Sequence, residues 1–217
     1  MFYGLRKNHF GPNGFLDKKS NLHPKDYAKN IVLNLGCGKQ VYGDVRLDKY
    51  RGEANVLADI DVSLPFKDNV FTIVYSRFVF EHLRNPGLVI EEMKRILKPK
   101  GRLILITDNA SYTPFYLTPF LGSGFHAGGY KGFGLDDKHY SIFTKEHIMH
   151  HMLSAGLESI IVNYVYANQI GGKDGIWQKT ASFLGLHKLG MIESFCKANI
   201  YATGIKPLNQ QPIPLDT

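Results

Sequence analysis

The sequence predicts a single α/β domain built on a doubly wound, mostly parallel sheet. Short apolar runs rich in β-branched residues alternate along the chain with stretches of helical period, a pattern typical of this class. The 217 residues, of which 44% are hydrophobic, suffice for one well-formed core. The two cysteines, Cys37 and Cys196, fit neither a disulfide framework nor a metal-ligand spacing. We therefore expect one domain in a reducing, cytoplasmic setting.

The apolar runs predict where the strands lie, and local start signals predict two helices. The short run at 31–35 is apolar except for Asn34 and includes β-branched residues, which suits a strand buried on both faces of the sheet. Asn85 is expected to cap a helix that has Pro86 at its first position, and Thr144 to cap another that runs to Leu153. Residues 98–101 should end the first of these helices. The remaining strands are expected at 45–47, 55–58, 70–75, 102–107, 159–166 and 198–205.

The connection between the first two strands is the most informative part of the chain. Gly36-Cys37-Gly38 follows the first strand directly, and two glycines around one small residue let the backbone turn sharply and approach a ligand. Asp48 ends the second strand, where an acid accepts ribose hydroxyls in nucleotide-type sites. Only about ten residues separate Gly38 from Asp48, fewer than a parallel crossover with a helix needs. The crossover helix is therefore expected to be reduced to about one turn or lost.

A G-x-G pair alone is weak evidence, but further motifs follow it in order. They are NLGCG at 34–38, LD at 47–48, ADI at 58–60, LPF at 64–66, FEHL at 80–83 and ILKPKG at 96–101. Together they resemble the class I S-adenosylmethionine-dependent methyltransferases, in particular the methyltransferase type 11 group, which includes members that accompany glycan-assembly enzymes. The resemblance is strong over roughly residues 30–110 and looser over 135–205. It is specific for the cofactor and much less so for the methyl acceptor.

The resemblance implies a fold and a set of cofactor contacts. The fold would be Rossmann-like, with seven strands and an antiparallel last strand. The cofactor would be S-adenosylmethionine. Its methionine end would approach the backbone of Gly36, Cys37 and Gly38, and its ribose hydroxyls would be bound by Asp48. The other contacts would be Asp59 with the adenine amino group, the backbone of Ile60 with the ring edge, and the backbone of Ser76 and Arg77 with the methionyl group.

Methyl transfer from a sulfonium requires mainly alignment, so a strong catalytic constellation is not needed. Glu81-His82 matches the EH pair that joins further carboxylates around magnesium in some quinone-type relatives. Those carboxylates are missing from the residues before the pair, so we expect no metal. His139 lies in a stretch similar to the D-x-H-x-x-x-F-T pattern of the glycan-associated members. His139 and His82 are the candidates for catalysis, with fastening of the loop as the alternative role for each.

The rest of the chain is expected to surround this site. We divide it into an N-terminal arm (1–29), a methyltransferase domain (30–206) and a disordered tail (207–217). Within the domain, the long aromatic and glycine-rich stretch 108–143 is interpreted as a substrate lid or loop. The insertion 168–195 is interpreted first as a packing helix, with a cover over the substrate mouth, a homodimer contact or a lipid contact as the alternatives. No stretch is long and apolar enough to span a membrane.

The formal charge of +7 favours an anionic partner, which makes a nucleic-acid methyltransferase one alternative. However, an Asn/Asp-Pro-Pro-aromatic motif is missing after the fourth strand, and neither cysteine is placed as a base-C5 nucleophile. A nicotinamide dehydrogenase would need a third glycine where the chain has Val41. A non-catalytic scaffold with the same fold is the alternative from a different class. We favour a methyltransferase acting at oxygen on a small or medium acceptor, with a sugar or glycan intermediate first.

Overall fold

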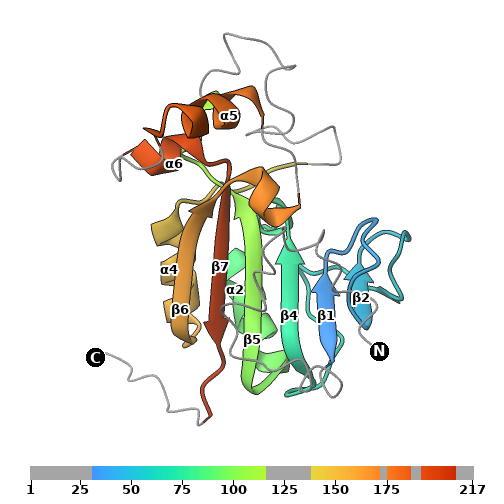
Figure 1. The fold of residues 1–217 in the computed structure, drawn as a ribbon. Coiled ribbons are helices and arrows are strands. Elements are labelled where there is room, and N and C mark those ends of the chain that lie inside the picture. Colours follow the sequence, from blue (N-terminus) through green and yellow to red (C-terminus); the bar gives the residue numbers. More distant parts are fainter. Residues whose placement is uncertain (1–30, 116–137, 172–174, 187–191, 209–217) are drawn as a thin grey trace.

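The computed structural model describes residues 31–115, 138–171, 175–186 and 192–208 (Figure 1). These residues form a seven-stranded sheet with the order β3-β2-β1-β4-β5-β7-β6. The strands are β1 (Val32–Leu35), β2 (Val45–Asp48), β3 (Val56–Leu57), β4 (Phe71–Arg77), β5 (Leu97–Asp108), β6 (Glu158–Val165) and β7 (Asn199–Ile205). The helices are η2 (Phe80–His82), α2 (Pro86–Ile96), α4 (Lys145–Ser154), η3 (Ala167–Ile170), α5 (Ile176–Phe183) and α6 (Glu193–Cys196).

The topology confirms the predicted sheet. Strands β1 to β5 pair in parallel, whereas β7 lies between β5 and β6 and is antiparallel to both. The connection between β1 and β2 contains no helix, so the shortened crossover is confirmed as well. The chain nevertheless pairs these two strands in register, with Leu33 opposite Val45. The third strand is only two residues long, shorter than its apolar run predicts.

The two predicted helices begin where expected, but their first turns differ. Thr144 caps α4 through a capping box in which its side chain accepts from the His147 backbone N–H. Asn85 occupies the N-cap position of α2 before Pro86, yet its side chain makes no capping hydrogen bond. Helix α2 ends at Ile96 and β5 begins at the next residue, earlier than the predicted start at residue 102.

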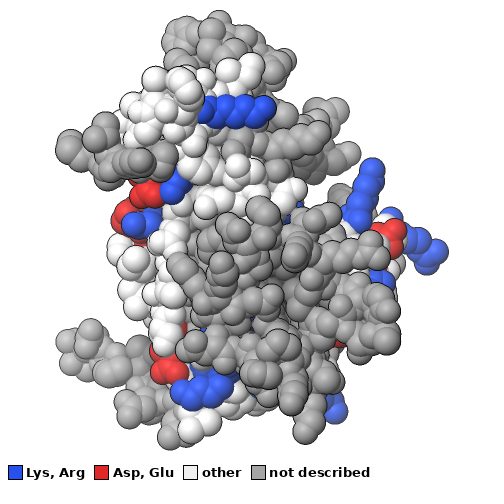
Figure 2. Space-filling view, viewed as in Figure 1, with Lys and Arg blue, Asp and Glu red and all other residues white. Residues whose placement is uncertain are grey.

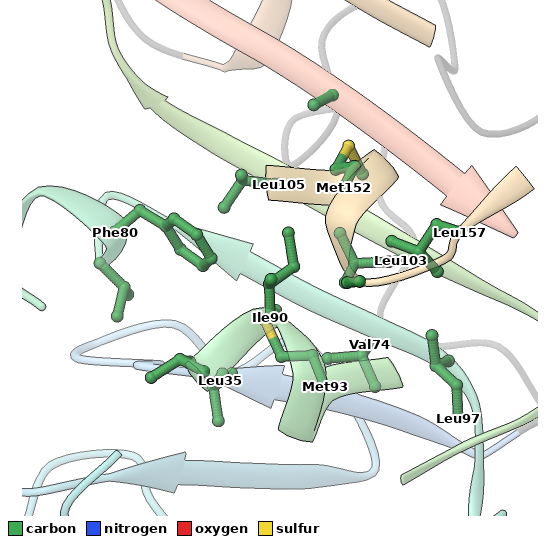
Figure 3. Packing of buried hydrophobic residues seen from close by; sticks show 14 of the residues in the cluster. Leu35, Val74, Phe80, Ile90, Met93, Leu97, Leu103, Leu105, Met152 and Leu157 are labelled. Carbon is green, nitrogen blue, oxygen red and sulfur yellow. The ribbon is translucent and has the colours of Figure 1, made fainter. Parts of the chain in front are cut away.

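The main core lies between one face of the sheet and helices α2 and α4 (Figure 3). Ile90 and Met93 of α2 and Met152 of α4 meet the fully buried Val74 of β4 and Leu105 of β5 there. The opposite face of the sheet carries a second cluster, which includes Ile73, Tyr75, Ile104 and Tyr201. Apolar side chains on both faces explain why these strands read as continuous hydrophobic runs.

Helices α5 and α6, which precede β7 in the chain, lie beyond the carboxyl ends of the parallel strands (Figure 1). Trp177 of α5 packs in a third cluster with Tyr112 and Phe115, and its indole N–H donates to the Phe195 carbonyl at 2.9 Å. Phe183, at the other end of α5, is exposed. The predicted arm (1–29), most of the lid and most of the tail lie outside the described residues. Among the helices that are described, none is long and apolar enough to cross a membrane.

Candidate functional site

The cofactor residues expected from the sequence gather at the carboxyl edge of the sheet. The glycine loop begins directly after Leu35 of β1, which is paired with Ser76 near the end of β4. On the other side of β1, β2 ends at Asp48. The ends of β1, β2 and β4 therefore form one edge, and this is where open α/β sheets bind ligands.

Gly36 is required by packing inside the protein. Its φ of +70° is a left-handed conformation, and a Cβ built on it would lie 2.2 Å from Cγ2 of Val79. The backbone N–H groups of Gly36 and Cys37 both donate to the Leu47 carbonyl, at 2.8 and 3.1 Å. These two amides thus fasten the loop to the end of β2, and they are not directed at a ligand.

Gly38 differs from Gly36 because it borders open space. Its φ is +51°, and a Cβ built on it would meet nothing within 4 Å in the described structure. Between the two glycines, the Cys37 side chain points into the protein and is 1% exposed. Burial raises the pKa of the Cys37 thiol above its usual range. The open approach at this loop is therefore to the backbone of Gly38.

Asp48 is held in place beside this open space by two backbone hydrogen bonds. Its Oδ2 accepts from the Gly38 N–H at 2.8 Å, and its Oδ1 accepts from the Tyr50 N–H at 3.0 Å. Each carboxylate oxygen has two lone pairs, so each can accept a further hydrogen bond. The side chain is thereby oriented for two hydroxyl groups, one for each oxygen.

Asp59 follows β3 and already has partners that the sequence analysis did not foresee. Lys49 Nζ lies 3.0 Å from its Oδ2, and the Asp61 N–H donates to its Oδ1 at 3.1 Å. The hydrogen bond with Lys49 holds the pKa of Asp59 below its usual range. Ile60 is partly buried against the main core. The assignment of Asp59 and Ile60 to the adenine ring remains a prediction, in which Lys49 and the ligand would share the carboxylate.

The end of β4 combines a buried hydroxyl with a strained backbone. Ser76 is fully buried, and its hydroxyl has no hydrogen-bond partner among the described residues. Arg77 lies over the ring of Phe78, 5.0 Å from its centroid. Phe78 has a φ of +54°, a left-handed conformation that is unusual for an aromatic residue. Strain of this kind is concentrated at binding and catalytic sites.

These observations fit the adenosine part of S-adenosylmethionine. Gly38 offers backbone that a ligand can approach, and Asp48 offers two oriented acceptors for the ribose hydroxyls. Ser76 supplies an orphaned buried hydroxyl near the same edge. The backbone amides of Gly36 and Cys37 bind Leu47, so their predicted contact with the methionine end would come from their carbonyls or from close packing.

The two predicted catalytic histidines lie beside each other. The rings of His82 and His139 are edge to face, with centroids 4.7 Å apart. One nitrogen or oxygen ligand atom from each of Glu81, His82 and His139 lies within 4.8 Å of the others. The structure therefore brings together residues that the sequence separates by more than fifty positions. Their catalytic role is still a prediction.

Two further polar residues of β5 belong to this cluster and were missed in the sequence. The Thr107 hydroxyl donates to Oε2 of the buried Glu81 at 2.6 Å. Burial, and then the neighbouring charge of Glu81, raise the pKa of Asp108 to about 8. The signal for both was their position at the end of an apolar strand, the same edge to which Asp48 and Ser76 belong.

Comparison with known proteins shows what part of the chain resembles. Residues 33–105 match the model of a family described as a methyltransferase domain. Among curated proteins, an uncharacterized protein of Escherichia coli called YafE is 52% identical over 44 residues, 20% of this chain and 21% of its own length. The ubiquinone/menaquinone biosynthesis C-methyltransferase UbiE of Paraburkholderia xenovorans is 31% identical over 99 residues, 41% of this chain and 40% of its own. The chain thus spans less than half the length of these relatives.

Solved structures resemble the chain over most of its length. A methyltransferase from Thermotoga maritima that depends on S-adenosylmethionine has a TM-score of 0.57 and 16% identity, covering 87% of this chain and 84% of its own. A chain from the complex between the Haloferax volcanii Trm112 methyltransferase activator and a methyltransferase has a TM-score of 0.55 and 16% identity, with 84% coverage of each. The chain therefore has the class I methyltransferase fold. Residues 33–105 are similar to a methyltransferase domain, and this similarity indicates S-adenosylmethionine as the cofactor.

Proposed function

We propose that this chain is an S-adenosylmethionine-dependent methyltransferase that acts on a small or medium acceptor. The observation that carries the proposal is the fixed carboxylate of Asp48, which accepts two backbone N–H groups beside the open space at Gly38. A carboxylate in this position, at the carboxyl edge of a methyltransferase sheet, suits a pair of ribose hydroxyls.

The chemistry requires little from the chain except binding and alignment. Bound S-adenosylmethionine supplies a methyl group that is bonded to a sulfonium sulfur. This sulfur is already a good leaving group. Asp48 would hold the ribose, Asp59 the adenine amino group, and the backbone around Gly38 the part of the cofactor nearest the methyl. Holding the acceptor in line with that methyl converts the reaction into an effectively unimolecular step.

The acceptor is predicted less directly. The sequence favours transfer to oxygen on a sugar or glycan intermediate, whereas the UbiE relatives are named for methylation at carbon. These relatives match about 40% of the chain, so they support the reaction class more than the acceptor atom. Carbon is thus the alternative to test beside oxygen. Glycan, aromatic and quinone-type acceptors belong in the same screen.

The competing nucleic-acid substrate gains no support from the surface. On the face shown in Figure 2, the Lys and Arg side chains of the described residues lie in separate groups. A nucleic-acid footprint needs several phosphate contacts along a continuous path. We prefer a small-molecule acceptor because the motifs of the nucleic-acid methyltransferases are missing from the sequence. A cytoplasmic location and a homodimer contact through residues 168–195 stay predictions from the sequence.

The experiment is calorimetric titration with S-adenosylmethionine and S-adenosylhomocysteine. Asp48→Ala should weaken both, since hydrogen bonds to a charged group contribute about 1.5–3 kcal/mol each. Two such bonds amount to about 3 kcal/mol or more, a loss of at least about 100-fold in affinity. Asp48→Asn keeps one acceptor oxygen. Its affinity for each compound should therefore lie between the affinities of wild type and Asp48→Ala.

Asp68→Ala is the matched control. Asp68 is an exposed aspartate before β4, at the opposite end of that strand, and its partner is Arg95. Its removal should leave both affinities unchanged. Folded wild-type protein that binds neither compound would refute the proposal, and so would equal binding by wild type and Asp48→Ala.

A further inference from the structure

Three side chains with metal-ligating atoms converge next to the end of β4. Glu81 and His82 belong to the short helix η2, and His139 comes from the segment just before α4. The two segments are fastened together by backbone, because the N–H groups of Tyr140 and Ser141 both donate to the Glu81 carbonyl, at 2.8 and 3.3 Å. The cluster is thus held by the fold and does not depend on side-chain contacts alone.

The His82 ring is oriented in the way that suits a metal ligand. Its Nδ1 lies 3.0 Å from the backbone carbonyl of Lys138. A carbonyl can only accept, so in the neutral ring Nδ1 carries the proton and the lone pair is on Nε2. Histidines that bind metals commonly donate one ring N–H to a carbonyl or carboxylate in this manner, which fixes the tautomer and the direction of the other nitrogen.

Glu81 is also oriented as a metal ligand, by a hydrogen bond from β5. The residue is 1% exposed, and the Thr107 hydroxyl donates to its Oε2 at 2.6 Å. A hydrogen bond that orients a ligating carboxylate is a regular outer contact of metal sites. The Thr107 hydroxyl provides such a contact for Glu81.

We propose that Glu81, His82 and His139 bind a divalent transition-metal ion. Two imidazoles and one carboxylate are the donor set of zinc, iron, cobalt or manganese sites, whereas magnesium prefers oxygen ligands alone. This proposal departs from the sequence-based expectation of no metal, which was drawn because the carboxylates that accompany the EH pair in some quinone-type relatives are missing before Glu81. The fold replaces them with a histidine from a distant segment.

Three protein ligands leave coordination positions open, as in catalytic metal sites. The cluster follows β4, at the sheet edge that carries Asp48 and Ser76. An oxygen of the methyl acceptor could complete the coordination there and lose its proton more easily. This last step rests on the proposed function, whereas metal binding itself does not.

The test is titration of the full chain with Co²⁺ and with Zn²⁺ after treatment with a chelator, in the absence of cofactor. Calorimetry should give one equivalent per chain, and Co²⁺ should produce visible absorption bands typical of nitrogen and oxygen ligation. His82→Ala and His139→Ala should abolish this strong binding. Thr107→Val should weaken it by about 10- to 100-fold, the usual effect of losing an outer contact. His150→Ala, which removes an exposed histidine of α4, is the matched control and should change nothing.

Several results would overturn the proposal. Folded wild type that binds neither ion is one, and binding that survives in both His82→Ala and His139→Ala is another. Loss of binding in His150→Ala would place the ion at the histidines of α4 instead. Circular dichroism checks that each variant is folded. If the ligand variants unfold, Thr107→Val carries the test, and unchanged affinity in that variant contradicts the site. Cofactor titration is a separate measurement, so either hypothesis can fail alone.

Discussion

The two glycines of the loop after β1 should respond to the same substitution in different ways. Gly36→Ala places a Cβ 2.2 Å from Cγ2 of Val79, and the φ of +70° remains unfavourable for alanine. The left-handed conformation costs about 1–2 kcal/mol. Forcing an extra carbon into a packed site costs about 1–3 kcal/mol. We therefore expect Gly36→Ala to lower the free energy of unfolding by about 2–5 kcal/mol.

Gly38→Ala should incur only the cost of the left-handed backbone conformation, without a clash. The φ of +51° is similar, but the new Cβ meets nothing within 4 Å. The free energy of unfolding should fall by about 1–2 kcal/mol. The methyl group would instead occupy the space that the cofactor is proposed to use, so S-adenosylmethionine should bind at least about 10-fold more weakly, a loss of about 1.4 kcal/mol.

Urea denaturation of wild type, Gly36→Ala and Gly38→Ala measures the free energy of unfolding. Calorimetry on the same proteins measures the affinity for S-adenosylmethionine. A double variant, Gly36→Ala with Val79→Ala, separates the clash from the backbone strain, because removing the Val79 methyl groups relieves only the clash. The double variant should therefore lose less stability than the two single variants together. The reasoning is refuted if Gly38→Ala is the more destabilised single variant. Unchanged cofactor affinity in Gly38→Ala would also refute it, since the open space would then lie outside the site.

Three further predictions concern the fold. Met93→Ala, at a fully buried position of α2, should lower the free energy of unfolding, measured with urea, by about 2–5 kcal/mol. Leu88→Ala, at a largely exposed position of the same helix, should change it by less than about 0.5 kcal/mol. Lys206→Met should lower the free energy of unfolding by more than about 1 kcal/mol in the same assay, because it removes the hydrogen bonds that the buried Lys206 ammonium donates to the carbonyls of Arg95 and Leu97 at 3.0 and 2.8 Å. Burial lowers the pKa of His151 below 6.5, so the folded state favours the neutral ring and stability should fall as the pH drops below about 6.5. His151→Gln should lose less stability than wild type over that range, and equal pH profiles would contradict a partly buried, neutral His151.

Local sequence patterns were sufficient for much of the sheet and the cofactor edge. The apolar run before Gly36 favoured a buried strand, and the short interval from Gly38 to Asp48 predicted a crossover helix reduced to about one turn or lost. Thr144 likewise predicted the start of α4, because its cap uses residues within one turn. Each of these features depends on neighbours in the sequence, which is why the sequence alone predicts them.

Features that depend on distant residues were not predictable in the same way. Asn85 looks like a cap, but its side chain makes no capping bond. Lys49 is an ordinary surface lysine in the sequence, and only the return of the chain after β3 brings it to Asp59. The meeting of His139 with Glu81 requires the backbone bonds that join two segments on either side of the long loop. No spacing rule relates such positions.

Asp48 and the open backbone at Gly38 are proposed to form the cofactor site, and a crystal structure of the chain with S-adenosylhomocysteine would show whether they do. Both ribose hydroxyls should lie within hydrogen-bond distance of the Asp48 carboxylate, with the ligand passing over Gly38 at the carboxyl edge of the sheet. A ligand bound at another edge, or one whose ribose makes no contact with Asp48, would contradict this proposal.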